Sequence, residues 1–331
     1  MRRLLSFTAI ALAGAALLAG CGGSDEGELT IYSGREEELI GELIDEVAER
    51  EDISIDVRYG ETPELAATIR EEGGNSPADV FFSQDAGALG ALASEGLLAR
   101  LPADVLETVP ARYRAPDGAW VGTSGRARII AYGPDVRASE LPASVLELTG
   151  PEWEDRLGWA PTNGSFQAFV TGMRVSLGEE RTREWLEGMV ANGTQSYADN
   201  SAIRDAIAAG EIDAGLINHY YVAEAKKEDP DYPVDAYFPP NDIGSMINVA
   251  GVGILESSEN REEALAFVRD LLTPPSQEYL AEGELEYPLV PGVPVDPSLR
   301  PLSEIPDPGV DLSSIDDLEG TLKLLQETGA L

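Results

Sequence analysis

The chain alternates short apolar segments with longer amphipathic ones, and this alternation restricts the fold more than any other feature. Residues 29–32 and 78–82 are short apolar runs of the kind that buried strands show. Residues 39–48 carry apolar side chains at helical spacing, and residues 53–57 alternate apolar and polar side chains as a half-buried strand does. Strand, helix and strand in this order are typical of βαβ units, so we expect an α/β fold with a mostly parallel sheet.

The same alternation continues along the rest of the chain. Further strands are expected at residues 128–131, 157–160, 214–217 and 249–255. Further helices are expected at residues 63–69, 86–93, 166–177, 182–190, 201–209 and 262–272. Prolines are frequent from residue 274 onward, which predicts a loop-rich C-terminal part. The 331 residues are enough for about two domains of ~150 residues each.

The N-terminus is typical of an export signal. After a short basic start, residues 4–19 are apolar and small, which is short for a membrane span of ~20 residues. The Leu-Ala-Gly-Cys ending resembles a bacterial lipobox, which makes residues 1–20 a lipoprotein signal peptide and Cys21 the lipidated first residue; a plain signal with a chance cysteine is the alternative. Residues 21–28 then form a flexible tether. We expect an extracytoplasmic protein, anchored to the cell membrane by lipid on Cys21 or located in the periplasm.

Charge and the scarcity of two residue types exclude several classes of function. The chain has 60 acidic and 23 basic residues, a net charge of −37, which repels nucleic-acid backbones and anionic lipid headgroups. It has one Cys and one His, which excludes a disulfide scaffold, zinc sites built on Cys and His, and iron–sulfur clusters. We therefore expect no nucleic-acid partner and no membrane contact apart from the lipid.

Polar side chains follow the expected strands, where an open parallel sheet binds its ligands. They are Ser33, Gly34 and Arg35; Ser83, Gln84 and Asp85; residues 161–165; and residues 218–221. These groups are hydroxyls, amides and guanidiniums, and none of them forms a recognisable pair of nucleophile and base. The set favours binding over catalysis, so no enzymatic activity is expected.

Tyr220 and Tyr221 lie between the strand expected at 214–217 and a helix-forming segment, 222–227. Because the backbone turns there, both phenol oxygens can converge on one point, where a helix N-terminus favours anions. Tyrosine loses its proton near pH ~10 unaided, and a bound cation lowers that value. Hard cations prefer oxygen donors, so the pair is a candidate clamp for ferric ion. The alternative is that both rings simply pack.

Five short motifs occur in order along the mature chain. They are Tyr-Ser-Gly-Arg at 32–35, Ser-Pro-Ala-Asp-Val-Phe at 76–81, Ser-Gly-Arg at 124–126, Asn-His-Tyr-Tyr at 218–221 and Glu-Tyr-Pro-Leu at 286–289. Over residues 28–331 the chain thus resembles the bacterial ferric-ion-binding proteins of ABC iron transporters, which are extracellular solute-binding proteins. The resemblance implies that Tyr220 and Tyr221 bind Fe(3+) together with a synergistic anion, carbonate or phosphate. It also implies a monomer that delivers iron to an ABC permease.

The resemblance further implies a type II periplasmic-binding fold, in which two Rossmann-like α/β lobes joined by crossing strands close over the ligand. One lobe is expected to comprise residues 29–126 and 251–300. The other is expected to comprise residues 127–250 and 301–331.

Three positions depart from the pattern of the family. Arg35 stands where a histidine ligand is common, and Gln84 where a glutamate ligand is common, so Gln84 is the remaining metal-donor candidate there. Asn163 and Phe166 stand near the place where some members carry a third tyrosine. Whether a carboxylate (Glu36, Glu37 or Asp85) supplies a further donor is left open.

The candidate anion ligands combine guanidinium and amide groups. Arg35 and Arg126 suit the planar oxygens of carbonate. Asn163, Gly164 and Ser165 precede an expected helix, an arrangement suited to an anion, and relatives bind theirs in this loop. Asn200 and Asn218 match anion-contacting positions of some members. The alternatives are that Arg35 is a surface charge and that Asn163 and Asn200 only cap helices.

Two other functions remain open from the sequence. The same fold carries other small solutes, and the arginines and the 163–165 loop alone suit a small oxyanion without metal. A secreted hydrolase would use His219 with an acidic partner. His219 either packs or hydrogen-bonds behind Tyr220, or binds the metal directly.

Overall fold

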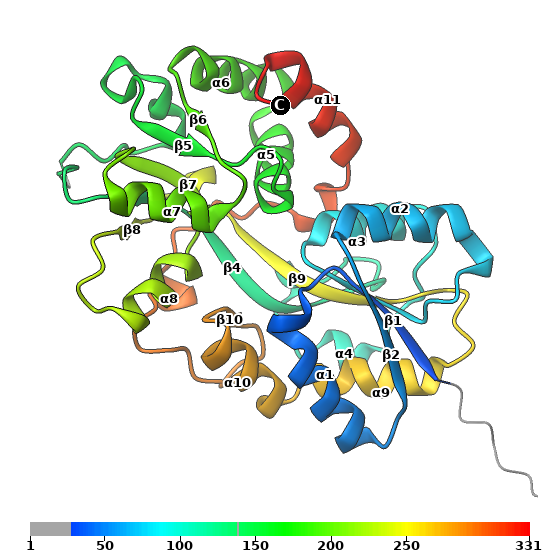
Figure 1. Cartoon of the computed structure of the whole chain (residues 1–331). Coiled ribbons are helices and arrows are strands. Elements are labelled where there is room, and N and C mark those ends of the chain that lie inside the picture. Colours follow the sequence, from blue (N-terminus) through cyan, green and yellow to red (C-terminus); the bar gives the residue numbers. More distant parts are fainter. Residues whose placement is uncertain (1–27, 138) are drawn as a thin grey trace, which may run out of the picture.

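A computed structural model describes residues 28–137 and 139–331 (Figure 1). The expected signal peptide, Cys21 and nearly all of the tether lie outside the described residues. Within the described part, no helix combines the length and apolar character needed to cross a membrane.

The strands form two sheets that share one long strand, β4 (Val121–Tyr132). The first sheet has the order β2-β1-β3-β9-β4. Its other members are β1 (Leu29–Ser33), β2 (Ile55–Tyr59), β3 (Val80–Ser83) and β9 (Ile247–Ile254), and the short β10 (Tyr287–Pro288) pairs with β4. Strands β1, β2 and β3 are parallel, whereas β9 runs antiparallel to both β3 and β4.

The second sheet is built on the last residues of β4. Residues 128–132 pair with β7 (Ala214–Asn218), and residues 130–132 also pair with β8 (Asp235–Tyr237). On the other side, β7 pairs in parallel with β5 (Leu157–Trp159), which pairs with β6 (Gln195–Ser196). One strand therefore belongs to both sheets and couples their positions.

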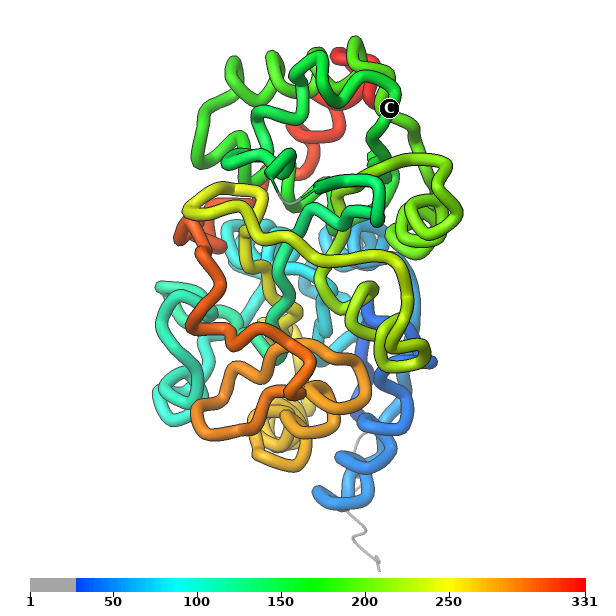
Figure 2. Tube along the Cα trace, turned by 90° about the vertical axis from the view of Figure 1, so that its left-hand side faces the viewer, coloured from blue at the N-terminus to red at the C-terminus, as the bar shows by residue number. Residues whose placement is uncertain are grey.

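Each sheet has its own helices. Those around the first sheet are α1 (Glu37–Glu51), α2 (Thr62–Glu72), α3 (Ala86–Ser94), α4 (Ala103–Leu106), α9 (Arg261–Leu271) and α10 (Pro274–Gly283). Those around the second are α5 (Gly164–Leu177), α6 (Glu179–Ala191), α7 (Asn200–Ala209), α8 (Tyr220–Glu228) and α11 (Leu318–Thr328). Figure 2 shows α11, in red, beside the green helices α5 and α6 at the end of the molecule opposite the blue N-terminal helix.

The C-terminal segment touches both groups of helices. The short 3₁₀ turn η7 (Leu312–Ser314) packs on α3, and α11 then packs on α5 and α6. Gly87 of α3 is so close to this segment that a Cβ there would lie 2.5 Å from the Ile315 carbonyl oxygen. The chain thus passes between the two groups of helices through this segment as well as through the strands.

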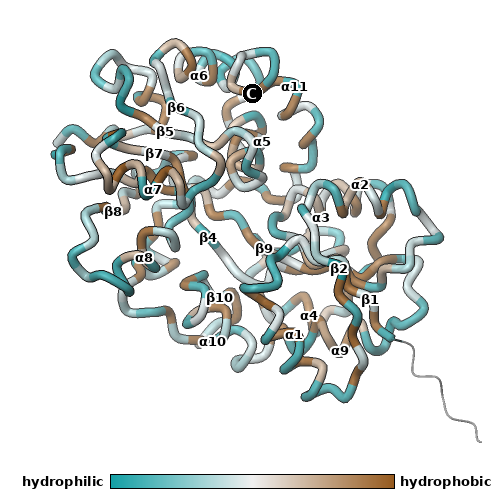
Figure 3. Tube along the Cα trace, in the orientation of Figure 1, coloured by the Kyte–Doolittle hydropathy of each residue, from teal (hydrophilic) through white to brown (hydrophobic). Residues whose placement is uncertain are grey.

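The core follows the strands. Every residue of β9 is buried, and so is every residue of β4 except Tyr132. Figure 3 shows the apolar stretches concentrated on strands and on the inner sides of helices, with polar loops outside. A smaller separate cluster brings together apolar residues of β4, β7, α7 and α8, among them Ile129, Ile203 and Ile217. The buried polar residues of β4 interrupt this apolar pattern, and they lie near the site described below.

The expected α/β fold and most expected elements are confirmed, and three expectations need correction. The sheet was expected to be mostly parallel but is mixed, because β9 runs antiparallel to β3 and β4, and β4 runs antiparallel to β7, β8 and β10. The strand expected at 128–131 is only part of β4, because the buried Gly125, Arg126 and polar neighbours break its apolar pattern. The C-terminal part is less loop-rich than expected, since it contains α10 and α11. Helix α10 begins at Pro274, and proline is tolerated in the first turn of a helix, where its missing N–H would have no partner.

Replacing Gly251 by alanine tests the close approach of β9 and β4. A Cβ at Gly251 would lie 2.7 Å from the Val121 carbonyl oxygen, so backbone has to shift. We expect Gly251→Ala to lower the free energy of unfolding by ~1–3 kcal/mol, measured by urea unfolding. In the control, Gly283→Ala, no atom lies within 4 Å of the added carbon, so stability should hold or rise slightly. Equal stability of the two variants would contradict the close packing.

Candidate functional site

A cleft of about 860 Å³ opens at the carboxyl ends of the strands. Its walls come from the loops after β1, β2, β3, β5, β6 and β7, as expected for an open α/β sheet. Nine of the ten residues predicted as metal or anion ligands line it: Arg35, Gln84, Asn163, Gly164, Ser165, Asn200, Asn218, Tyr220 and Tyr221. The tenth, Arg126, lines a small cavity next to this cleft.

The two tyrosines open helix α8, directly after β7 and His219. Their ring centroids are 4.4 Å apart with planes tilted by 31°, and both residues border the cleft. The rings therefore pack on each other without leaving the cleft. Burial, together with the neighbouring phenol of Tyr220, raises the pKa of Tyr221 well above its usual value. A metal that binds Tyr221 must displace this proton.

His219 lies behind the tyrosine pair. Its Nδ1 accepts a hydrogen bond from the backbone N–H of Ala127 at 3.2 Å. The imidazole stacks on Tyr287, with centroids 4.4 Å apart, and meets the Tyr220 ring edge-on at 5.7 Å. It is buried and absent from the cleft lining, and burial lowers its pKa to about 4. Of the two roles considered for His219, packing behind Tyr220 is the one that the geometry displays.

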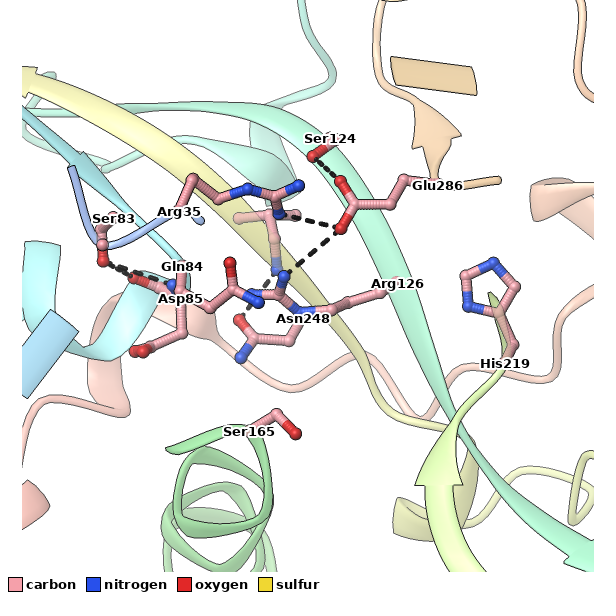
Figure 4. A network of polar contacts seen from close by, with 12 residues as sticks. Arg35, Ser83, Gln84, Asp85, Ser124, Arg126, Ser165, His219, Asn248 and Glu286 are labelled. Atoms are coloured by element: carbon pink, nitrogen blue, oxygen red, sulfur yellow. Dashed lines mark hydrogen bonds and ion pairs between the residues drawn. The ribbon is translucent and has the colours of Figure 1, made fainter. Parts of the chain in front are cut away.

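Arg35 and Arg126 share one buried carboxylate, that of Glu286 (Figure 4). Arg35 Nη1 donates to Glu286 Oε1 at 2.9 Å, Arg126 Nη1 donates to the same oxygen at 3.5 Å, and the Ser124 hydroxyl donates to the other oxygen. Burial alone would raise the pKa of Glu286, but the two guanidiniums outweigh it and hold that pKa below its usual value. Arg35 is 2% exposed, so the alternative of a surface charge is wrong.

The opposite wall of the cleft is formed by hydrogen-bonded asparagines. Asn163 caps α5, since its Oδ1 accepts from the Ser165 N–H at 3.0 Å, and it also accepts from Asn200 Nδ2 at 3.4 Å. Asn200 Oδ1 in turn accepts from the Asn218 N–H at 3.3 Å. Asn200 does not cap its helix, because the Asp199 side chain fills that role by accepting from the Ala202 N–H.

Arg128 supports this wall from behind, and it was not among the predicted site residues. Its Nη2 donates to the Ser165 carbonyl oxygen at 2.6 Å, and its Nη1 donates to Asn200 Oδ1 at 3.4 Å. Burial, and then repulsion from Arg126, lowers the pKa of Arg128 to about 10. A signal for it exists in the sequence: Ser124, Arg126 and Arg128 alternate along one strand, which places them on one face.

Gln84 and Asp85 have different roles although they are neighbours. Gln84 lines the cleft, and its side-chain oxygen is buried without a hydrogen-bond partner in the described structure. Asp85 caps α3 by accepting from the N–H groups of Gly87 and Ala88 at 2.8 and 3.2 Å. One oxygen of the Asp85 carboxylate, Oδ1, is therefore used by the helix cap, whereas the Gln84 side-chain oxygen is free as a donor.

Carboxylates surround the cleft but do not converge. Five glutamates from the starts of α1 and α2 border it: Glu36, Glu37, Glu38, Glu61 and Glu64. In residues 28–137 and 139–331, no group of three or more His, Cys, Asp or Glu side chains is placed to hold a metal ion. A metal in this cleft must depend on other oxygen donors, and the phenols of Tyr220 and Tyr221 are the adjacent ones.

Comparison with known proteins is consistent with this geometry. A model of bacterial extracellular solute-binding proteins matches residues 75–311. The chain is 31% identical to the Fe(3+)-binding periplasmic protein of Serratia marcescens, over 99% of both chains. It is 33% identical to the major ferric iron-binding protein of Neisseria meningitidis, over 91% of this chain and 93% of the relative.

Comparison with solved structures also shows similarity to iron-binding proteins. Iron-bound HitA from Pseudomonas aeruginosa superimposes with a TM-score of 0.85 at 32% identity, covering 91% of this chain and 99% of HitA. Trichodesmium IdiA (FutA), in complex with iron and citrate, gives 0.80 at 30% identity, covering 92% and 99%. The chain therefore belongs to the bacterial extracellular solute-binding proteins of the type II periplasmic-binding fold, in the family of the ferric-ion-binding proteins.

Proposed function

We propose that this protein binds ferric ion together with a small anion outside the cytoplasmic membrane and delivers the ion to an ABC permease. The observation that carries the proposal is the tyrosine pair: Tyr220 and Tyr221 both border a cleft without converging carboxylates. Phenolate oxygen is a hard donor, and ferric ion is a hard cation. The relatives named for ferric iron support the choice of ion.

Metal binding in this cleft requires the loss of phenol protons. The raised pKa of Tyr221 keeps its proton in place in the metal-free protein at neutral pH. A trivalent ion at the oxygen stabilises the phenolate and displaces the proton to water, in the way that metals acidify bound water and thiols. Gln84 Oε1 is our candidate for a further, neutral donor. His219 stays behind Tyr220 and holds the ring rather than the ion.

A bound anion would balance the excess positive charge at the floor of the cleft. Three buried guanidiniums, those of Arg35, Arg126 and Arg128, lie there, and Glu286 is the carboxylate that pairs with the first two. A ferric ion next to this positive floor needs a negative partner. Carbonate or phosphate meets free donors here, because Arg35 Nε and Nη2 and Asn218 Nδ2 have no hydrogen-bond partner in the described structure. The α5 N-terminus at Asn163, Gly164 and Ser165 completes the anion site.

The remaining parts of the proposal concern the whole protein. Residues 29–126 with 251–300 form one lobe, and residues 127–250 with 301–331 form the other; the two close over metal and anion. Lipid on Cys21 holds the mature protein, a monomer, at the cell membrane. A hydrolase receives no support, because His219 does not border the cleft.

The role of the tyrosine pair can be tested by visible absorption spectroscopy. Ferric loading in bicarbonate should give a visible phenolate-to-iron absorption band in the unmodified protein. We expect Tyr220→Phe with Tyr221→Phe to abolish the band, because both phenolates are lost. Tyr237→Phe, a half-buried tyrosine of β8 outside the cleft lining, is the control and should retain it. A colourless unmodified protein under these conditions would argue against ferric ion.

The anion site can be tested by placing one negative charge in it. Asn163→Asp preserves the cap of α5, since aspartate caps as well as asparagine, but replaces an amide donor by a carboxylate. We expect the bicarbonate concentration for half-maximal iron loading to rise more than about tenfold, which corresponds to ~1.4 kcal/mol, with the thermal midpoint unchanged. Asn75→Asp adds the same charge at an exposed position outside the cleft lining and should have no effect.

Titration with carbonate or phosphate also tests the alternative in which the protein transports an oxyanion without metal. If metal-free protein binds carbonate or phosphate tightly in calorimetry, and the double tyrosine variant binds them equally well, the oxyanion rather than iron is the transported solute. Unchanged bicarbonate dependence in Asn163→Asp would remove this loop from the anion site.

A further inference from the structure

One edge of β4 is covered by two different strands with a gap between them. β10 pairs with β4 at Ser124 and Gly125, and β7 pairs with it from Arg128 to Tyr132. Because β9 occupies the opposite edge of β4 over residues 121–127, β10 and β7 lie on the same edge. β10 belongs to the first sheet and β7 to the second, so the gap lies where β4 passes from one sheet to the other.

His219 fills this gap. Its backbone N–H donates to the Ala127 carbonyl oxygen at 3.0 Å, and its Nδ1 accepts from the Ala127 N–H at 3.2 Å. These two bonds satisfy the backbone groups of Ala127 that neither β10 nor β7 reaches, and a buried backbone group needs such a partner. The His219 side chain therefore continues the hydrogen-bond ladder between the two strands.

The His219 ring is also the middle part of a row of aromatic rings. It stacks on Tyr287 of β10, with centroids 4.4 Å apart and planes 12° from parallel. It meets Tyr220 edge-on at 5.7 Å, and Tyr220 lies against Tyr221 at 4.4 Å. Stacked and edge-to-face rings at these distances attract each other in a defined geometry. The row thus connects β10 of the first sheet to the two tyrosines of the cleft.

Tyr287 contributes its ring to this row rather than its hydroxyl. The side chain is fully buried, and its hydroxyl has no hydrogen-bond partner in the described structure. Tyr287 directly follows Glu286, whose carboxylate pairs with Arg35 and Arg126. Two consecutive residues therefore hold the arginines of the cleft floor and the ring behind the tyrosine pair.

We propose that Tyr287 is a positioning residue for the metal donor Tyr220 and that it acts through His219. This inference rests on the proposed ferric function. Tyr287 belongs to the first sheet and Tyr220 follows a strand of the second, so the orientation of the phenol depends on how the two sheets meet at β4. A movement of β10 away from β7 unstacks Tyr287 and leaves the rings of His219 and Tyr220 free to turn.

Tyr287→Leu tests the stack, because it removes the ring but keeps an apolar side chain. We expect ferric binding, measured by competition with a chelator, to weaken about two- to tenfold. The phenolate-to-iron band should also shift, because the Tyr220 phenolate is no longer held in one orientation. Tyr287→Phe should retain the affinity and the band of the unmodified protein, since the hydroxyl has no partner. An unshifted band with unchanged affinity in Tyr287→Leu would overturn the proposal.

Tyr113→Leu is the matched control for loss of stability. Tyr113 is likewise buried with an unpaired hydroxyl, but it does not line the cleft. We expect this variant to lower the thermal midpoint and to leave the band and the ferric affinity unchanged. If it shifts the band as Tyr287→Leu does, the effect is one of general stability and the positioning role is wrong.

His219→Asn tests the route. Asparagine keeps an acceptor for the Ala127 N–H but removes the ring, so it should weaken ferric binding as Tyr287→Leu does. The double variant should be no weaker than either single variant, because both remove the same contact. Additive losses would show that Tyr287 acts independently of His219. If Tyr287→Leu does not fold, the band and affinity of His219→Asn decide instead.

A colourless unmodified protein would contradict the ferric proposal, and the positioning role would then be decided without metal. In crystals of metal-free Tyr287→Leu, the Tyr220 ring should be turned from its place against Tyr221. A Tyr220 ring that keeps its orientation there would overturn the proposal.

Discussion

The buried carboxylate of Glu286 is the interaction on which the binding floor depends. It accepts from Arg35, Arg126 and Ser124, and so it ties the loop after β1 to β4 and to the short strand β10. Removing one partner from a buried ion pair leaves an uncompensated charge, at a cost of ~3–5 kcal/mol. The floor therefore remains in place only while these segments, far apart in the sequence, stay together.

This floor gives the molecule two opposite electrostatic regions. The chain as a whole carries −37, and glutamates border the cleft, so cations are attracted to its mouth. Beneath them, three guanidiniums are buried, with Glu286 paired to two of them. Such a site suits neither a bare cation nor a bare anion, but it suits the two bound together. The phenols of Tyr220 and Tyr221 lie where the two regions meet.

Local pattern was enough to predict the alternating elements and the residues that follow the strands. Arg35 lies at the carboxyl end of β1 in the first sheet, and the tyrosine pair and the 163–165 loop lie at the carboxyl ends of β7 and β5 in the second. The two sets border one cleft because β4 joins the two sheets. Local pattern could not predict partners distant in sequence: Arg35 and Glu286 are 251 positions apart, and they meet only because β10 pairs with β4. Arg128 was missed for a related reason, since its role depends on α5 and α7 lying over β4.

The contact of the C-terminal segment with α3 has a consequence for mobility. A hinge made of β4 and β9 alone would let the two groups of helices swing apart about one axis. The segment from η7 to α11 adds a third tie, anchored on α3 at one end and on α5 and α6 at the other. Because Gly87 leaves no room for a side chain against Ile315, the tie is tightly packed at its α3 end. Any movement of one group of helices relative to the other must therefore rearrange residues 305–317 as well as β4 and β9.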